Sequence, residues 1–142
     1  MTYQECMETC LVEIKKYHTA RRNEVDKFDP WIFQDIRDEL SEALVHFGPL
    51  YADLRADAEQ AENDRKIHYE TRKEFWKDHF EGKRGTASLA ESKALQDCED
   101  IMKSETEANR KYYQARTLVE RIDQVLNGTA SRLKLLEKHG KN

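Results

Sequence analysis

The sequence predicts an all-α protein: a long antiparallel helical hairpin with an additional N-terminal helix. Three observations favour this class. Charged residues make up 37% of the 142 residues, the chain has only five Gly and two Pro, and apolar residues recur at helical spacing. So polar a composition with so few turn residues is typical of helices with narrow apolar stripes and unlike a compact α/β domain. Aromatic residues recur inside the periodic segments, which argues against disorder.

Narrow apolar stripes also predict self-assembly. Burial stabilises a protein by roughly 25 cal/mol per Å² of apolar surface, and a thin hairpin gains little against the entropy of ordering its chain. Contacts with further copies would make up the difference, so we expect an oligomer-forming protein. We divide the chain into an N-terminal helix with its linker at residues 1–28 and the long hairpin with a basic tail at residues 29–142.

The first helix is expected from near the N-terminus to about Arg22, followed by a linker from Asn23 to Phe28. Its apolar positions step by 4, 3, 4 and 3, which is a heptad-like pattern. These positions are Tyr3, Met7, Cys10, Ile14 and Tyr17.

The second helix is expected to start at Asp29-Pro30 and to run to about Phe80. Asp is a good N-cap, and Pro at the first helical position lacks only an N–H that has no helical partner. Gly48-Pro49 lies inside the apolar stripe without changing its phase, which predicts a kink and not a turn. The stripe includes Ile32, Ile36, Leu40, Ala43, Phe47, Leu50, Leu54, Ala58 and Ala61.

The clearest break lies at residues 81–86, where Gly82 suits a left-handed helix C-cap. Ser88 and Glu91 then have the spacing of a capping box, which predicts that the next helix begins there. Its stripe is expected to weaken at Asn127-Gly128. The stripe comprises Leu95, Cys98, Met102, Ala108, Tyr112, Ala115, Val119, Ile122 and Leu126, and resumes with Leu133 and Leu136. Its later part, with Leu118, is the predicted oligomer interface: Leu118, Val119, Ile122, Leu126, Leu133 and Leu136.

No motif for catalysis is present. The chain contains no Gly-rich phosphate loop, no GxSxG and no HExxH, and its five His share no ligand spacing. Cys6 and Cys10 lie one helical turn apart and in principle offer two thiolates to a metal, but we favour an apolar role for them. We therefore predict no enzyme activity, no cofactor and no metal site.

The cysteines and the N-terminus predict where the protein works. Three Cys at no disulfide-framework spacing indicate a reducing, intracellular setting. Acidic residues interrupt any apolar run near the N-terminus, so no signal peptide is expected, and no stretch is apolar enough to span a membrane. The expected location is the cytoplasm.

Charge changes sign along the second helix. Residues 35–64 contain nine acidic and two basic residues, whereas residues 65–84 contain seven basic and four acidic residues. Aromatic residues are interleaved with these bases. Cations neutralise phosphates and aromatic faces stack on unpaired bases, so this pattern suits single-stranded nucleic acid. The alternative is a solvated basic face with a buried aromatic stripe. The predicted DNA-binding residues are Arg65, Lys66, Arg72, Lys73, Trp76, Lys77, Lys83 and Arg84.

The order of these features resembles the phage recombination mediator proteins of the UvsY type. The resemblance covers roughly residues 29–139 and lies in four stretches: Gly48-Pro49-Leu50-Tyr51, the basic and aromatic run from Arg72 to Lys83, Asp97-Cys98-Glu99-Asp100, and Arg110-Lys111-Tyr112-Tyr113. The chain differs from the family in its net charge of −4 and in Asn127-Gly128, where the family tends to carry an Arg in continuous helix.

The resemblance implies a function. Such proteins are homo-oligomeric rings that bind single-stranded DNA and help a RecA-like recombinase to displace single-strand-binding protein. The DNA-contacting bases of the family lie late in the helix before the Gly turn, a region that here holds Arg72, Lys73 and Lys77. If the chain is phage-encoded, the expected location is the host cytoplasm.

Two other functions stay open. The chain could be a structural or adaptor helical oligomer with no nucleic-acid binding, in which the acidic stretch at residues 35–64 is the protein-binding face. It could also be an enzyme whose site assembles between subunits, although only scattered His and carboxylates favour that.

Overall fold

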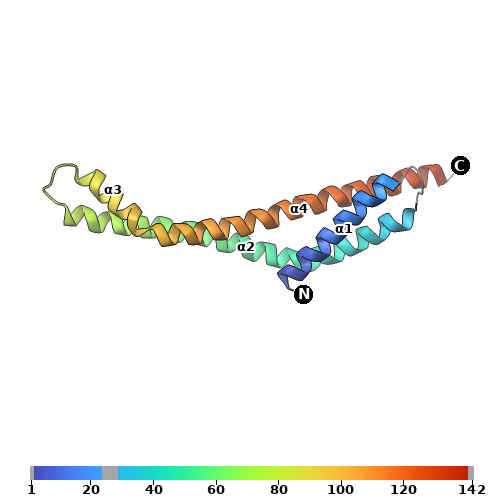
Figure 1. The fold of residues 1–142 in the computed structure, drawn as a ribbon, viewed down its shortest axis with the longest axis horizontal. Coiled ribbons are helices and arrows are strands. Elements are labelled where there is room, and N and C mark those ends of the chain that lie inside the picture. The colour runs from blue at the N-terminus through green and yellow to red at the C-terminus, as the bar shows by residue number, and fades with distance from the viewer. Residues whose placement is uncertain (1, 24–28, 141–142) are drawn as a thin grey trace. The chain divides into compact units, whose positions relative to one another are not determined.

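The computed structural model describes residues 2–23 and 29–140, with the side chains of all of these except 136 and 138–140. Four helices follow one another there: α1 (Tyr3–Asn23), α2 (Pro30–His79), α3 (Thr86–Asp97) and α4 (Glu99–Gly140) (Figure 1). No strand occurs among the described residues, so the predicted all-α class is confirmed. The predicted linker begins too early, because Asn23 belongs to α1, and its remaining residues 24–28 lie outside the described part.

The helices divide into two compact units. Unit 1 comprises Met1–Ala52 and Gln114–Asn142, and unit 2 comprises Asp53–Tyr113. Unit 1 therefore holds α1, the first part of α2 and the last part of α4. Unit 2 holds the later part of α2, the whole of α3 and the first part of α4. None of the described helices has the long apolar stretch that crossing a bilayer requires.

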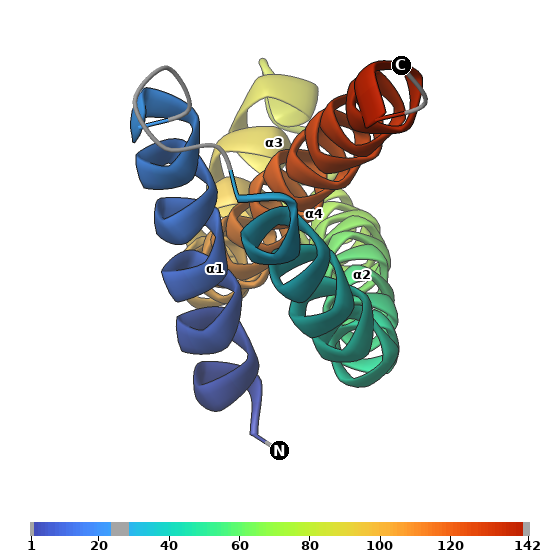
Figure 2. The ribbon, with the colours of Figure 1, turned by 90° about the vertical axis from the view of Figure 1, so that its right-hand side faces the viewer.

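The three helical segments of unit 1 lie side by side (Figure 2), and large apolar side chains from each of them form its core. Tyr3 stacks on Phe47, and Tyr17 meets Phe33 edge-on, so α1 packs along the first part of α2. Fully burying a Leu, Ile or Phe side chain contributes about 1.5–3 kcal/mol. The core residues are Cys6, Cys10, Ile14, Tyr17, Phe33, Ile36, Leu40, Ala43, Phe47, Ala115, Leu118, Ile122 and Val125.

The buried stripes of unit 1 differ slightly from the predicted ones. On α1, Cys6 is fully buried whereas Tyr3 and Met7 are half-buried. On α2, Phe33 is buried and Ile32 is exposed. Both Ile32 and Phe33 keep helical spacing to the next turn, at four and three residues from Ile36, so spacing alone did not distinguish them. The larger side chain, the aromatic Phe33, occupies the core.

Gly128 lies inside α4, which continues through it. The predicted weak point at Asn127-Gly128 is therefore wrong. A Cβ at residue 128 would lie 2.7 Å from Cζ of Tyr17 and would also overlap the Tyr17 hydroxyl oxygen. The glycine therefore leaves room for the Tyr17 side chain of α1 against α4, and it does not end the helix.

The start of α2 is as predicted. Asp29 Oδ1 accepts a hydrogen bond of 3.0 Å from the backbone N–H of Trp31, and Pro30 is the first helical residue. Pro49 lies inside the helix, which continues to His79.

The turn between α2 and α3 contains two glycines in the left-handed conformation, Gly82 (φ 82°) and Gly85 (φ 70°). The conformation of Gly82 was predicted, but the capping box was not correct. Helix α3 begins at Thr86, two residues before Ser88, and Gly85 occupies its N-cap without a side-chain hydrogen bond. The Thr86 hydroxyl instead donates to the carbonyls of Phe80 and Lys83, which closes the turn.

Candidate nucleic-acid interface

All predicted DNA-binding residues lie in unit 2, on the later part of α2 and in the turn that follows it. Unit 2 has a small apolar core, and its buried hydrophobic residues among those described are Ala58, Ala90, Ala94 and Cys98. Its charged and aromatic side chains therefore determine much of its packing as well as its surface.

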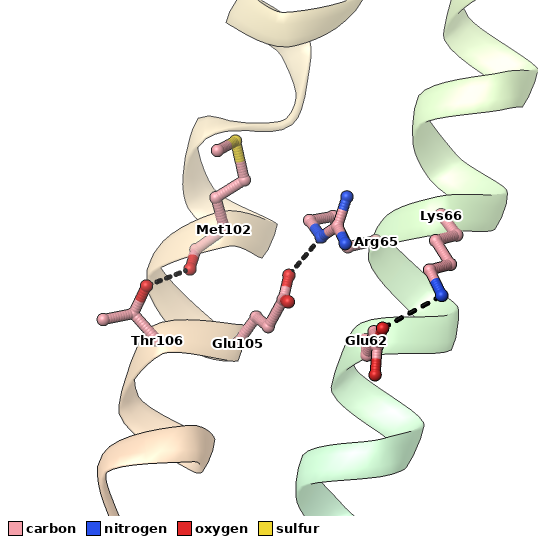
Figure 3. Close-up of polar contacts among 6 residues, drawn as sticks. All are labelled: Glu62, Arg65, Lys66, Met102, Glu105 and Thr106. Atoms are coloured by element: carbon pink, nitrogen blue, oxygen red, sulfur yellow. Dashed lines mark hydrogen bonds and ion pairs between the residues drawn. The ribbon is translucent and has the colours of Figure 1, made fainter.

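Four of the predicted bases are paired with carboxylates of the same chain. Arg65 Nε donates to Glu105 on α4, while Lys66 Nζ lies 2.9 Å from Glu62 on its own helix (Figure 3). Lys73 Nζ lies 3.3 Å from Glu70, which raises the pKa of the lysine through the hydrogen bond. The fourth pair is Arg72 with Asp97, at 2.7 Å. A phosphate must compete with a carboxylate for each of these cations.

Three predicted bases make no ion pair with any described residue: Lys77, Lys83 and Arg84. All three are exposed, at the end of α2 and in the turn after it. Lys83 Nζ lies 5.6 Å from the ring centroid of Phe80, a distance suited to a cation–π contact. These three cations are the part of the predicted set whose charge is available to an anion in solution.

Trp76 makes contacts through both its indole N–H and its ring. Its indole N–H donates to Asp97 Oδ2 at 2.7 Å, and its ring stacks with that of Phe80 at a centroid distance of 5.6 Å. The cations of Arg72 and Lys93 each lie 5.8 Å from the indole centroid. The half-buried Trp76 therefore joins α2 to α3, and it is a less accessible stacking surface than its sequence context predicted.

Phe75 is the accessible aromatic side chain of this region. It is 49% exposed, its ring stacks with that of His79 at 6.4 Å, and the Arg72 guanidinium lies 4.4 Å from its centroid. The sequence suggested a core position for Phe75 as the alternative to a DNA role. Its i+3 spacing from Arg72 and i+4 spacing to His79 were the available signals of a cation–aromatic cluster on one helix face.

Asp97 is the functional candidate that the sequence missed. Hydrogen bonds from Trp76 and Arg72, together with the charge of Arg72, hold the pKa of this carboxyl below its usual range. Asp97 is 25 residues from Arg72 and 21 from Trp76. No local pattern reveals a contact at such separations.

The predicted oligomer-interface residues lie in unit 1, and two of them are part of its core. Leu118 and Ile122 are buried within the chain itself, so a second copy cannot contact them while this packing holds. Val119, Leu126 and Leu133 are half-buried, and Leu136 lies outside the described side chains.

The cysteine pair of α1 is buried in unit 1. Burial, and then the charges of Cys6 and Glu13, raise the pKa of Cys10 to about 11, which favours its protonated form at neutral pH. Among the residues that the structure describes, no group of three or more His, Cys, Asp or Glu side chains is placed to hold a metal ion. Buried, protonated thiols are typical of an apolar role.

No protein-family model matches the chain, and no curated protein or solved structure is significantly similar to it.

Proposed function

We propose that this chain is a non-enzymatic recombination mediator that binds single-stranded DNA as a homo-oligomer. The observations that carry the proposal are the exposed Phe75–His79 stack near the end of α2 and three exposed cations without an ion pair to a described residue, Lys77 on the last turn of that helix and Lys83 and Arg84 in the turn after it. Unpaired cations attract the phosphate backbone, and an exposed ring offers a stacking surface to any base. Such a site binds single strands without reading their sequence.

The proposal includes the antiparallel hairpin of α2 and α4. Two contacts in unit 2 support it: Arg65 on α2 pairs with Glu105 on α4, and Arg72, further along α2, pairs with Asp97 at the end of α3, just before α4 begins. As the residue number rises along α2, the residue number of the partner falls, which is expected of segments that run in opposite directions.

Self-assembly is supported by apolar side chains that unit 1 leaves in solvent. Trp31 is 73% and Val45 is 72% exposed, and both are large enough to favour burial against another copy. Repeating a small cationic site around an oligomer raises the overall affinity through effective concentration, which compensates for a modest single site. A ring is the form that the family resemblance implies.

The mediator role itself rests on the resemblance, and it extends to the expected partners, a RecA-like recombinase and a single-strand-binding protein. The acidic part of α2 is a candidate contact for them. The proposed location is the cytoplasm, that of the host if the chain is phage-encoded.

The DNA-binding proposal is tested by reversing the three available cations together, as Lys77→Glu, Lys83→Glu and Arg84→Glu. A matched control reverses three exposed bases of unit 1, as Lys15→Glu, Arg22→Glu and Lys134→Glu. The readout is fluorescence anisotropy with a labelled oligothymidylate over a range of salt, with mass photometry to follow the oligomer.

We expect the unit 2 variant to lose binding while its oligomer persists. The wild-type affinity should fall with salt with a slope of about −0.7 per phosphate contacted. The control should retain most of its affinity. Equal loss in both variants would show that binding follows the total charge of the chain and not this site.

A structural or adaptor oligomer without nucleic-acid binding is the second candidate. The neutralisation of Arg65, Lys66, Arg72 and Lys73 by carboxylates of the same chain favours it. A wild-type chain that forms a stable oligomer but binds no oligothymidylate at low salt would establish this candidate.

A further inference from the structure

Two donors on α2 converge on a single carboxylate oxygen. Arg72 Nε and Trp76 Nε1 each donate to Oδ2 of Asp97, both at 2.7 Å. The donors are one helical turn apart, and the acceptor is the last residue of α3. A guanidinium and an indole N–H directed at one anionic oxygen form a receptor for an oxyanion, and a phosphate offers the same kind of oxygen.

This receptor adjoins the proposed DNA site. The Arg72 guanidinium lies against Phe75, the exposed ring of that site, and Lys93 adds a second cation near Trp76. The Arg72 and Asp97 side chains are 32% and 29% exposed, so solvent and ions reach the pair. An incoming strand therefore reaches an Arg72 guanidinium that is already paired with Asp97.

The other ion pair between helices of unit 2 has an equally exposed arginine, since Arg65 is 31% exposed, but a less accessible carboxylate. Glu105 is only 16% exposed, and among the described side chains it accepts a hydrogen bond from Arg65 alone. Arg65 is also two to three helical turns from Phe75 along α2. That pair has the features of a structural link, whereas Asp97 occupies a site that a ligand could reach.

Building on the proposed function, we propose that Asp97 is an internal competitor for the DNA phosphate. In the free protein its carboxylate occupies the Arg72–Trp76 receptor. When a single strand binds, a phosphate oxygen replaces the carboxylate on Arg72, and the bond from the Trp76 indole N–H to Asp97 is broken. The competitor weakens binding, so that only a strand engaging several subunits is retained.

The test compares Asp97→Asn with wild type in the full chain. Asn removes the charge but keeps an oxygen that can accept from the Trp76 indole. Asp78→Asn is the matched control, because Asp78 is an exposed acid of α2 with no ion pair to a described residue. Affinity for an oligothymidylate is measured by anisotropy across salt concentrations.

We expect Asp97→Asn to gain about one phosphate contact, which steepens the salt slope by about 0.7 and tightens binding about fivefold at 0.1 M salt. Asp78→Asn should leave the slope unchanged. Adding Arg72→Gln to Asp97→Asn should remove the gain. A slope in Asp97→Asn equal to that of wild type or of Asp78→Asn would overturn the competitor role and leave the proposed function standing. A wild-type chain with no salt-dependent binding would refute the proposed function instead.

A second measurement needs no change at Asp97. The chain has two tryptophans, and the indole signal that persists in a Trp31→Phe variant identifies, in the wild-type spectrum, the signal of Trp76. Its indole N–H signal in NMR should shift when saturating oligothymidylate displaces the carboxylate. A bound complex in which this signal does not move would contradict the proposal even if Asp97→Asn fails to fold.

Discussion

The two units of this chain are held together differently, although they share two of their helices. Unit 1 buries large side chains from three helical segments, including Phe33, Phe47 and Ile122. Unit 2 buries chiefly alanines and a cysteine. The two ion pairs that join different helices and have both partners described lie in unit 2, namely Arg65–Glu105 and Arg72–Asp97.

This difference in packing assigns most of the stability to unit 1 and the candidate binding site to unit 2. Apolar burial scales with area, so the large side chains of unit 1 contribute most of the hydrophobic stabilisation. Unit 2 leaves its cations and rings accessible and fixes its geometry with polar contacts. Substitutions on the surface of unit 2 should therefore change ligand binding more than they change folding.

The largest expected effect comes from one substitution made at two sites of the same helix. Leu40→Ala empties a fully buried position in unit 1 and should lower the free energy of unfolding by about 2–5 kcal/mol. Leu54→Ala removes the same atoms from a half-buried position in unit 2 and should cost about 1 kcal/mol. Urea titration by circular dichroism gives the two costs, and peptide-resolved hydrogen exchange assigns each to its unit. Equal costs would refute the contrast between the units.

The next effect tests the close approach of α1 and α4. Gly128→Ala should destabilise unit 1 by about 1 kcal/mol, because the overlap of the new methyl group with Tyr17 costs about 1–3 kcal/mol and the better helix propensity of Ala offsets about 1 kcal/mol of it. Asn127→Ala, at the exposed neighbouring position, should instead raise stability by a few tenths of a kcal/mol, roughly the difference in helix propensity. The midpoints of urea unfolding compare the two variants. A stabilised Gly128→Ala variant would show that the glycine is not needed for packing.

The smallest effect is local and depends on pH. The pKa of Asp97 is lowered from 3.8 by its bonds to Trp76 and Arg72, so the folded state favours the charged carboxylate. The stabilising contribution is present above the ordinary pKa and is lost as pH falls through the lowered value. In the Trp31→Phe variant, a change in Trp76 fluorescence should occur below about pH 4 and should be absent when Asp97→Asn is added. The His79 ring also lies 5.3 Å from that of Trp76, so only the change that requires Asp97 reports on this carboxyl. A change that requires Asp97 but occurs above pH 5 would contradict this assignment.

Features of the fold that depend on neighbouring residues could be predicted from the sequence. Asp29-Pro30 starts α2, and Gly82 adopts the left-handed conformation of a helix end. These positions follow from backbone preferences that act over a few residues. The choice of Phe33 over Ile32 could not be predicted, because it depends on which side chain packs against Tyr17 of the facing helix. The role of Gly128 likewise depends on Tyr17, more than 100 residues earlier.

The candidate site likewise has features that the sequence predicts and features that it does not. Its bases were identified from composition and spacing along one helix. The partners that neutralise Arg65 and Arg72 were not, because they are 40 and 25 residues away in the sequence. Periodicity places a side chain on a face of a helix, but the carboxylate that meets it depends on how a second helix is aligned with the first. The site that remains accessible was therefore visible only in the structure.

Ala90, Ala94 and Cys98 are spaced four residues apart and are almost completely buried. Their importance to unit 2 is steric, since they contribute little apolar area but allow α3 to approach closely enough for Asp97 to reach both donors of α2. Evolutionary change at these positions should be restricted by volume more than by polarity. Serine or glycine is compatible with that spacing, whereas leucine, the more hydrophobic choice, would push the helices apart and break the polar contacts that give unit 2 its form.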